Sequence, residues 1–201
     1  MEFIRKFFKL SKKMIEPVIA DVSSNESPMI LLDIKICNIS KLADGLSPVD
    51  LINCIKFFQQ ICYKIVYEFG GQINKCETDH VQSFWLLAQD SYCTNFIEYG
   101  SAAFKIIHEL KNINLKYVHK KIYSIPVNCI LTMGSCGYFI KNNEIVNVIG
   151  LPVIRLNRYM KLIGKIENSI VVDDSIKNIF KDYTYSRIEA SEEKLYKLHQ
   201  I

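Results

Sequence analysis

The sequence predicts an α+β fold in which a mainly antiparallel sheet is flanked by helices. Strand-like and helix-like segments alternate along the 201 residues, and several of the strand-like segments come as hairpins. Hydrophobic residues make up 49% and charged residues 23% of the chain, which is the balance of a folded domain. Because the hairpins are separated by helices, the first half is expected to be ferredoxin-like.

The N-terminal region is expected to form a helix and a linker. Residues 2–16 place apolar side chains on one helical face and lysines on the other. Such a helix can lie on an anionic membrane, pack on a partner helix, or simply cap the domain. Residues 23–28 are polar and end in proline, which predicts a linker. We therefore expect a domain over residues 28–186, preceded by residues 1–27 and followed by a tail, 187–201.

The elements of the first half follow from local patterns. Residues 29–36 form an apolar run broken by one aspartate, as in a buried central strand. A helix is expected from Ser47-Pro48, an N-cap with proline in the first turn, to about Phe69, where two glycines stop it. The next elements are a hairpin of residues 72–76 and 80–87 with a turn at 77–79, a helix over 96–110 and a polar connection over 112–123.

The second half continues the alternation. Residues 127–133 and 136–140 predict a strand pair that turns at Gly134. The remaining expected elements are a helix over 152–163, a strand over 170–172, a short helix over 174–180 and a last amphipathic helix over 190–201.

Charge and cysteine content exclude several classes of protein. The net charge of +4 equals that of the first 13 residues alone, so the rest of the chain is neutral and nucleic acid is not expected as a partner. The seven cysteines are an odd number without CxxC spacing, which argues against a disulfide framework or a zinc site and favours the reducing cytoplasm. No signal peptide is recognisable at the N-terminus. The four histidines are scattered, and we interpret them as structural or solvated.

Two aspartates suggest a metal site. Asp33 interrupts the first expected strand, and Asp79 lies at the tip of the first hairpin. In a ferredoxin-like sheet that strand lies beside the hairpin, so the two carboxylates can converge. Two carboxylates and a backbone carbonyl can hold hard cations and leave room for phosphate oxygens. The alternative is that Asp33 caps the strand end and Asp79 is an ordinary turn residue.

The segments around these aspartates resemble the class III nucleotide cyclase domain. The resemblance runs in order through ILLDIKICNISKLADGLSP, GGQINKCETDHVQSFW, VIGLPVIRLNR and SIVVDDSIKNIF, over about residues 29–180. It implies a dimer that makes 3′,5′-cyclic nucleotides from nucleoside triphosphates at the subunit interface, with two divalent cations, Mg²⁺ or Mn²⁺. The implied metal-binding residues are Asp33, Asp79 and the carbonyl of Ile34. Arg158 matches the arginine that stabilises charge on the phosphates, and Lys75 and Asn147 match positions that read the base.

The sequence also departs from the family pattern. Ile36, Cys37 and Asn38 stand where the family usually has Gly-Phe-Thr, in a loop that presents backbone N–H groups to the triphosphate. Thr78 replaces a glycine, and Ile154 replaces the asparagine that orients the ribose. The expected function is a nucleotide cyclase, with ATP favoured because guanine readers usually have glutamate at position 75. The alternatives are an inactive cyclase-homology domain that dimerises or binds nucleotide, and a pyrimidine nucleotide cyclase like those of the Pycsar antiphage systems.

Overall fold

The computed structural model describes residues 23–87, 96–111, 124–163, 166–180, 183–189 and 193–199. Within them the chain forms one eight-stranded sheet, in which β2-β3-β1-β4-β6-β8-β7 are neighbours and β5 pairs with β4. Only the β4–β6 pair is parallel. The strands are β1 (Ser23–Ile36), β2 (Gln72–Cys76), β3 (His80–Leu86), β4 (Val127–Lys141), β5 (Glu144–Ile149), β6 (Ser169–Asp173), β7 (Thr184–Arg187) and β8 (Leu195–His199). The helices are α2 (Ile39–Asp44), α3 (Pro48–Glu68), α4 (Phe96–Lys111), α5 (Leu151–Leu162) and α6 (Asp174–Lys177).

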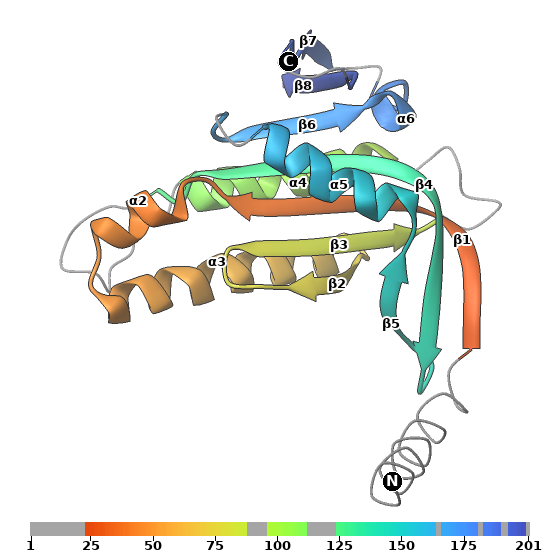
Figure 1. Cartoon of the computed structure of the whole chain (residues 1–201), viewed down its shortest axis with the longest axis horizontal. Coiled ribbons are helices and arrows are strands. Elements are labelled where there is room, and N and C mark those ends of the chain that lie inside the picture. Colours follow the sequence, from red (N-terminus) through yellow and green to blue (C-terminus); the bar gives the residue numbers. More distant parts are fainter. Residues whose placement is uncertain are drawn as a thin grey trace, which may run out of the picture.

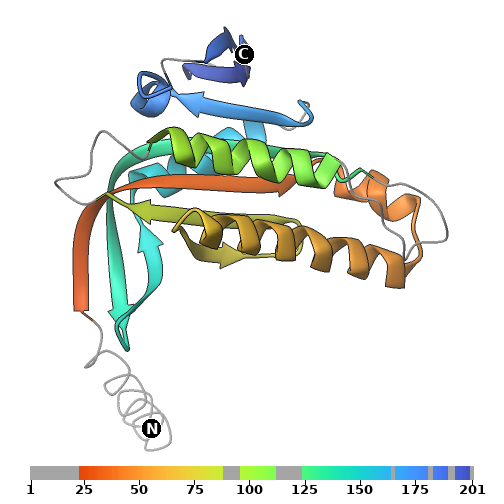
Figure 2. The same ribbon diagram turned by 180° about the vertical axis from the view of Figure 1, so that it is seen from behind.

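The sheet separates two helical layers. α5 lies on one face of the sheet in Figure 1, and α3 and α4 cover the opposite face in Figure 2. The order β2-β3-β1-β4, together with α3 and α4, is the ferredoxin-like arrangement expected for the first half. The predicted α+β class with a mainly antiparallel sheet is confirmed.

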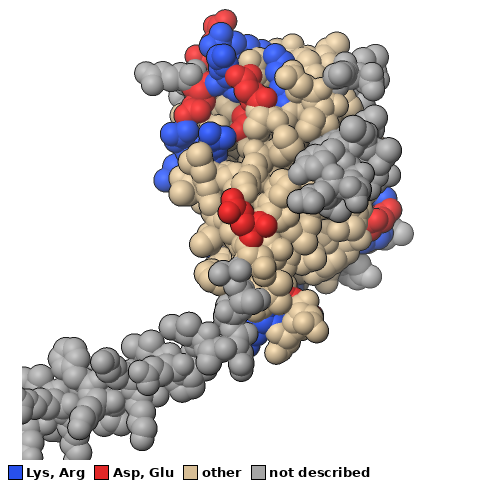
Figure 3. All heavy atoms as spheres, turned by 90° about the vertical axis from the view of Figure 1, so that its right-hand side faces the viewer, with Lys and Arg blue, Asp and Glu red and all other residues tan. Residues whose placement is uncertain are grey.

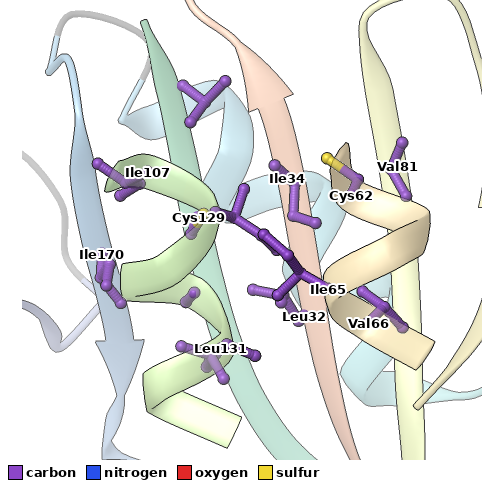
Figure 4. Close-up of a cluster of buried hydrophobic side chains, with 14 of the residues drawn as sticks. Leu32, Ile34, Cys62, Ile65, Val66, Val81, Ile107, Cys129, Leu131 and Ile170 are labelled. Atoms are coloured by element: carbon purple, nitrogen blue, oxygen red, sulfur yellow. The ribbon is translucent and has the colours of Figure 1, made fainter. Parts of the chain in front are cut away.

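Side-chain alternation along β1 divides the core between these layers. Leu32 and Ile34 pack with α3 and α4, whereas Met29 and Leu31 pack in a second cluster with α5. Figure 4 shows the first cluster, where Ile65 of α3 lies among the β1 side chains. Successive residues of a strand point to opposite faces, so Asp33 belongs to the α5 face.

The expected helix over 48–69 is confirmed with its ends. Ser47 accepts a hydrogen bond from the Asp50 backbone N–H at 3.2 Å, and Pro48 occupies the first turn. At the other end Gly70 has a φ of 71°, a left-handed conformation that glycine adopts without strain. The chain is thereby turned from α3 into β2, so that the β2–β3 hairpin runs back along the sheet.

The expected linker at residues 23–28 is wrong. These residues form the N-terminal part of β1, paired with β4 from Ser23 opposite Ile140 to Pro28 opposite Ser135. β1 pairs with β3 only from Met29 onward, so this stretch has a single partner strand and tolerates proline. Figures 1 and 2 show this part of β1 bending away from the rest of the sheet together with β5 and the end of β4.

The expected strand pair around Gly134 is also wrong. β4 continues through Gly134 without a turn. The turn lies at Asn142 and Asn143, whose φ angles of 53° and 63° are typical of a type I′ hairpin turn. A Cβ at Gly134 would lie 2.6 Å from Cγ of Pro152. The glycine therefore serves the close approach of α5 to β4, and it makes no turn.

The C-terminal residues add strands where a helix was expected. β8 pairs with β6 and β7, which extends the sheet beyond its ferredoxin-like half. Leu195 and Leu198 are three residues apart, which is a helical spacing, but in β8 they lie in the core clusters on opposite faces of the sheet, so pairing with β6 decides the structure of this segment. α2 was not predicted, and α6 ends earlier than expected.

Two predictions concern residues outside the described ranges, namely the helix over 2–16 and the connection over 112–123. Among the described helices, none combines the length and apolar character needed to cross a bilayer.

In Figure 3, acidic and basic side chains gather together in the upper part of the molecule, and the surface below them is mostly uncharged.

Candidate active site

Asp33 lies in the interior of the sheet, between β3 and β4. Its direct neighbours across the sheet are Gln82 and Ile130. The side chain is fully buried. A buried carboxylate is costly unless it is paired or hydrogen-bonded, so the partners of Asp33 define this site.

His80 is the one side chain that contacts the carboxylate among the described residues. A ring nitrogen of His80, Nε2, contacts Oδ1 of Asp33. The other oxygen, Oδ2, is buried and is the only such side-chain atom without a hydrogen-bond partner in the described part of the chain. Burial lowers the pKa of His80, but the hydrogen bonds and charges of Asp33 and Glu77 outweigh it, so the pKa is raised. Asp33 therefore keeps one oxygen available for a ligand.

Asp79 is held against the end of β1 by backbone and charge. The Ile36 N–H donates to the Asp79 carbonyl oxygen at 2.9 Å, which fastens the β2–β3 turn to β1. Nζ of Lys35 lies 3.8 Å from Oδ2 of Asp79. Both expected metal-binding carboxylates thus face a basic side chain of this strand pair, Asp33 facing His80 and Asp79 facing Lys35.

A cavity of about 330 Å³ opens at this end of β1. It is lined by Lys35, Ile36, Cys37, Asn38, Ile39, Ser40, Asp79, Asn128, Met160 and Lys161. Its volume falls within the usual range of small-molecule sites, about 300–1,000 Å³. The predicted loop residues and Asp79 are therefore brought together around one cavity.

The loop that follows β1 uses two of its backbone donors internally. The Ile36 N–H donates to Asp79 and the Cys37 N–H to the Pro126 carbonyl at 2.8 Å. Asn38 has a φ of 51°, and its side-chain amide donates to Glu167 at 3.1 Å. Desolvation by burial raises the pKa of Cys37 to about 11. Any backbone donor for a phosphate in this loop must therefore come from Asn38 or beyond.

The predicted base-reading residues are Lys75 on β2 and Asn147 on β5, and a hydrogen bond of Asn74 joins these two strands. Asn74 accepts a hydrogen bond from the Val148 N–H at 2.9 Å, and it occupies a bulge between Ile73 and Lys75. Lys75 is exposed and pairs with Glu77 at 2.6 Å, while Asn147 is exposed next to Val148. The two strands are adjacent, but Lys75 makes its ion pair with Glu77.

Arg158 does not line the cavity beside Asp79. It is exposed on α5 and forms an ion pair with Glu193, beside a separate cavity of about 450 Å³ that Arg155, Tyr159 and Asp173 also line. Ile154, one turn earlier on α5, is 65% exposed. Within one chain the predicted arginine and the predicted metal-binding residues do not share a cavity.

The residues present fit a divalent cation at Asp33. A buried carboxylate oxygen without a partner is a suitable donor for a hard cation, and Asp79, whose backbone bonds to Ile36 three residues further along β1, supplies a second carboxylate at this end of the strand. In the described part of the chain, no three His, Cys, Asp or Glu side chains are already gathered around one point. A cation at this site would therefore need ligands from a bound phosphate or from water.

Comparison with known proteins identifies the fold. No protein-family model and no curated protein matches the sequence. Among solved structures, the guanylyl cyclase domain of the RhoGC fusion protein from the aquatic fungus Blastocladiella emersonii superposes with a TM-score of 0.70 at 14% identity, covering 88% of this chain and 97% of that one. The adenylyl cyclase CyaB from P. aeruginosa gives a TM-score of 0.62 at 15% identity, covering 89% and 97%. A rhodopsin-guanylyl cyclase catalytic core with converted specificity, in complex with ATPαS, gives 0.69 at 14% identity, covering 90% and 98%. The chain therefore has the fold of the class III nucleotide cyclase catalytic domain, in a divergent form.

Three residues of the site were not predicted from the sequence. His80 was interpreted as structural or solvated, although it contacts Asp33; Asn74 and Glu193 were not singled out. The Glu77–His80 spacing across a turn was visible in the sequence. The contact between β1 and β3 that gives His80 its partner is visible only in the fold.

Proposed function

We propose that the protein is a nucleotide cyclase that converts a nucleoside triphosphate, with ATP favoured, to a 3′,5′-cyclic nucleotide and pyrophosphate. The observation that carries the proposal is the fully buried Asp33, whose Oδ2 has no partner, on the fold of a class III cyclase domain. An aspartate inside an apolar strand costs stability, and a cation-binding role explains why a carboxylate stands there.

The reaction joins the ribose 3′-oxygen to the α-phosphorus. The bond from the α-phosphorus to the β-phosphate oxygen breaks, pyrophosphate leaves, and the hydroxyl proton is released. Two divalent cations, Mg²⁺ or Mn²⁺, held by Asp33, Asp79 and the Ile34 carbonyl, would supply positive charge beside the attacking and leaving oxygens.

The remaining residues would bind and orient the triphosphate. The cavity beside Asp79 receives the phosphates, with contacts from Asn38 and the cationic side chains of Lys35 and Lys161 on its wall. Lys75 would exchange its partner Glu77 for an acceptor on the base, and Asn147 would make the second base contact.

The active form would be a homodimer. Within one chain Arg158 lines a different cavity from Asp79, so it would serve the site of a second copy and would exchange its partner Glu193 for that site. Exposed apolar side chains on β5 and at the start of α5, the helix that carries Arg158, would be covered by that copy. They are Val146, Ile149 and Leu151.

A direct assay tests the proposal. The purified protein is incubated with Mn²⁺ and, separately, ATP, GTP, CTP or UTP, and pyrophosphate and cyclic nucleotide are measured by mass spectrometry. We expect cyclic AMP from the native chain and from the control Asp44→Ala, which removes an exposed aspartate of α2. We expect no cyclic AMP from Asp33→Ala, in a preparation whose melting curve matches that of the native protein. Best turnover of CTP or UTP would favour a pyrimidine cyclase.

A second candidate is an inactive module of the same fold that dimerises or binds nucleotide. Two internal hydrogen bonds of the phosphate loop, from the Ile36 and Cys37 N–H groups, favour it, since those donors are already used. A folded dimer that binds triphosphate but forms no pyrophosphate with any of the four nucleotides would establish this function.

A further inference from the structure

His80 is placed beside Asp33 by the register of the sheet. It is the first residue of β3 and pairs with Lys35 of β1, so it is a diagonal cross-strand neighbour of Asp33 on the α5 face. Only 12% of its side chain is exposed. The ring is therefore largely enclosed and lies against the carboxylate.

Both ring nitrogens of His80 face carboxylates. Nε2 contacts Oδ1 of Asp33, and Nδ1 lies 3.6 Å from Oε2 of Glu77. Glu77 is itself held in place, because its N–H donates to the His80 carbonyl at 2.7 Å, and without a bound base its side chain also pairs with Lys75 at 2.6 Å. A carboxylate behind the second ring nitrogen is the arrangement that orients metal-binding histidines in proteins.

We propose that His80 is a nitrogen ligand of the cation bound at Asp33, and that it makes this centre prefer a transition-metal ion such as Mn²⁺ over Mg²⁺. The inference rests on the proposed function, since it assumes that Asp33 binds a cation. Neutral imidazole has a lone pair for a transition-metal ion, whereas Mg²⁺ takes oxygen ligands and keeps its water.

Binding of an ion between His80 and Asp33 would require little rearrangement of these side chains. Two neighbouring ligand atoms on an octahedral ion with bonds of about 2.1 Å lie roughly 3 Å apart. Nε2 and Oδ1 are already in contact, and Oδ2 is free. A small separation of the two side chains therefore admits an ion between them, with Glu77 still behind Nδ1.

Electron spin-echo spectroscopy of bound Mn²⁺ tests the assignment without measuring turnover. The full chain is loaded with Mn²⁺ and inorganic triphosphate, which contains no nitrogen, so any coupled nitrogen belongs to the protein. We expect a ¹⁴N coupling that changes to ¹⁵N when the protein is labelled with [¹⁵N]histidine. The coupling should be lost in His80→Gln, whose amide can still donate to Asp33. It should be kept in the control His199→Gln, which changes an exposed residue at the end of β8.

Binding constants give a second readout. For His80→Gln we expect the Kd for Mn²⁺ to rise by at least about tenfold and the Kd for Mg²⁺ to change by less than about threefold. Bound Mn²⁺ without nitrogen coupling, or equal losses for both metals, overturns the assignment of His80 and leaves the proposed function standing. If the native chain binds no Mn²⁺ and Asp33→Asn changes nothing, the metal site of the proposed function fails as well.

Discussion

At the scale of single residues, a substitution of Ile154 can distinguish a cyclase with an altered site from an inactive domain of the same fold. If the proposed function holds, Ile154 stands where the cyclase family that the sequence resembles has an asparagine for the ribose, and an isoleucine would not make that hydrogen bond. The side chain is 65% exposed, so the chain does not need an apolar residue here for its own core. The residue can therefore be changed with little effect on folding.

We predict that Ile154→Asn raises kcat by about 10- to 100-fold with little change in KM, because the amide would act mainly as the reacting oxygen approaches phosphorus. The melting temperature should stay within about 2 °C of the native value, since exposed substitutions cost little. Steady-state kinetics and a melting curve measure both. Val49→Asn, which changes an apolar side chain of α3 that is 66% exposed, is the control. Unchanged turnover in a stable variant contradicts the assignment of this position to the ribose.

Cys37 provides a residue-scale probe of the cavity. With a pKa of about 11, only roughly one Cys37 thiol in 1,000 is ionised at pH 8, against about one in ten for a thiol with a pKa of 9. We predict that iodoacetamide modifies exposed Cys76 at least about tenfold faster than Cys37, as followed by peptide mass spectrometry. Denatured protein, in which the two should react alike, is the control. Equal rates in the folded protein would show that this wall of the cavity is open.

At the scale of elements, the packing of α5 on β4 fixes where α5, which carries Arg158, lies on the sheet. Gly134 makes this contact possible, because Pro152 occupies the space where a Cβ would stand. A substitution there must move α5 or bend β4, and either movement displaces Arg158 relative to the sheet.

We predict that Gly134→Ala lowers the free energy of unfolding by about 1–3 kcal/mol, the usual cost of overpacking. The matched control is Gly137→Ala on the same strand, where an added Cβ has no neighbour closer than 3.7 Å. That variant should stay within about 0.5 kcal/mol of the native protein. Urea unfolding of both variants measures the difference, and equal stabilities would contradict the close contact between β4 and α5.

At the scale of the whole molecule, Arg158 does not line the cavity beside Asp79, so the proposed function would depend on assembly of two chains. If each site combines Asp33 and Asp79 of one chain with Arg158 of another, two different inactive chains can together form one intact site per heterodimer. This arrangement also predicts that a monomeric variant is inactive although every site residue is present.

We predict that mixing Asp33→Ala with Arg158→Ala chains restores activity to about a quarter of the native level, because half of randomly mixed dimers are heterodimers and each has one intact site of two. The two chains alone should each be inactive. Native mass spectrometry confirms that subunits have exchanged. Full exchange without recovered activity would contradict a shared site.

The sequence by itself determined the elements whose signals are local. Ser47-Pro48 and Gly70 set the ends of α3, and the apolar run containing Asp33 marked β1 as a buried strand. The resemblance carried in order along residues 29–180 was enough to expect the fold that the comparisons identify. Caps, turns and runs of this kind act within a few residues, so they are legible without a partner.

Only the tertiary structure decided the features that depend on distant partners. Residues 23–28 are polar and end in proline, yet pairing with β4 makes them strand. Gly134 stays within β4 because it pairs with Met29 of β1, and Leu195–His199 is strand because β6 offers it an edge. His80 is ordinary as a residue and becomes part of the site only where β3 meets β1 and sets its ring against a buried carboxylate. Cross-strand register and close packing join residues far apart in the chain, and no local pattern encodes that contact.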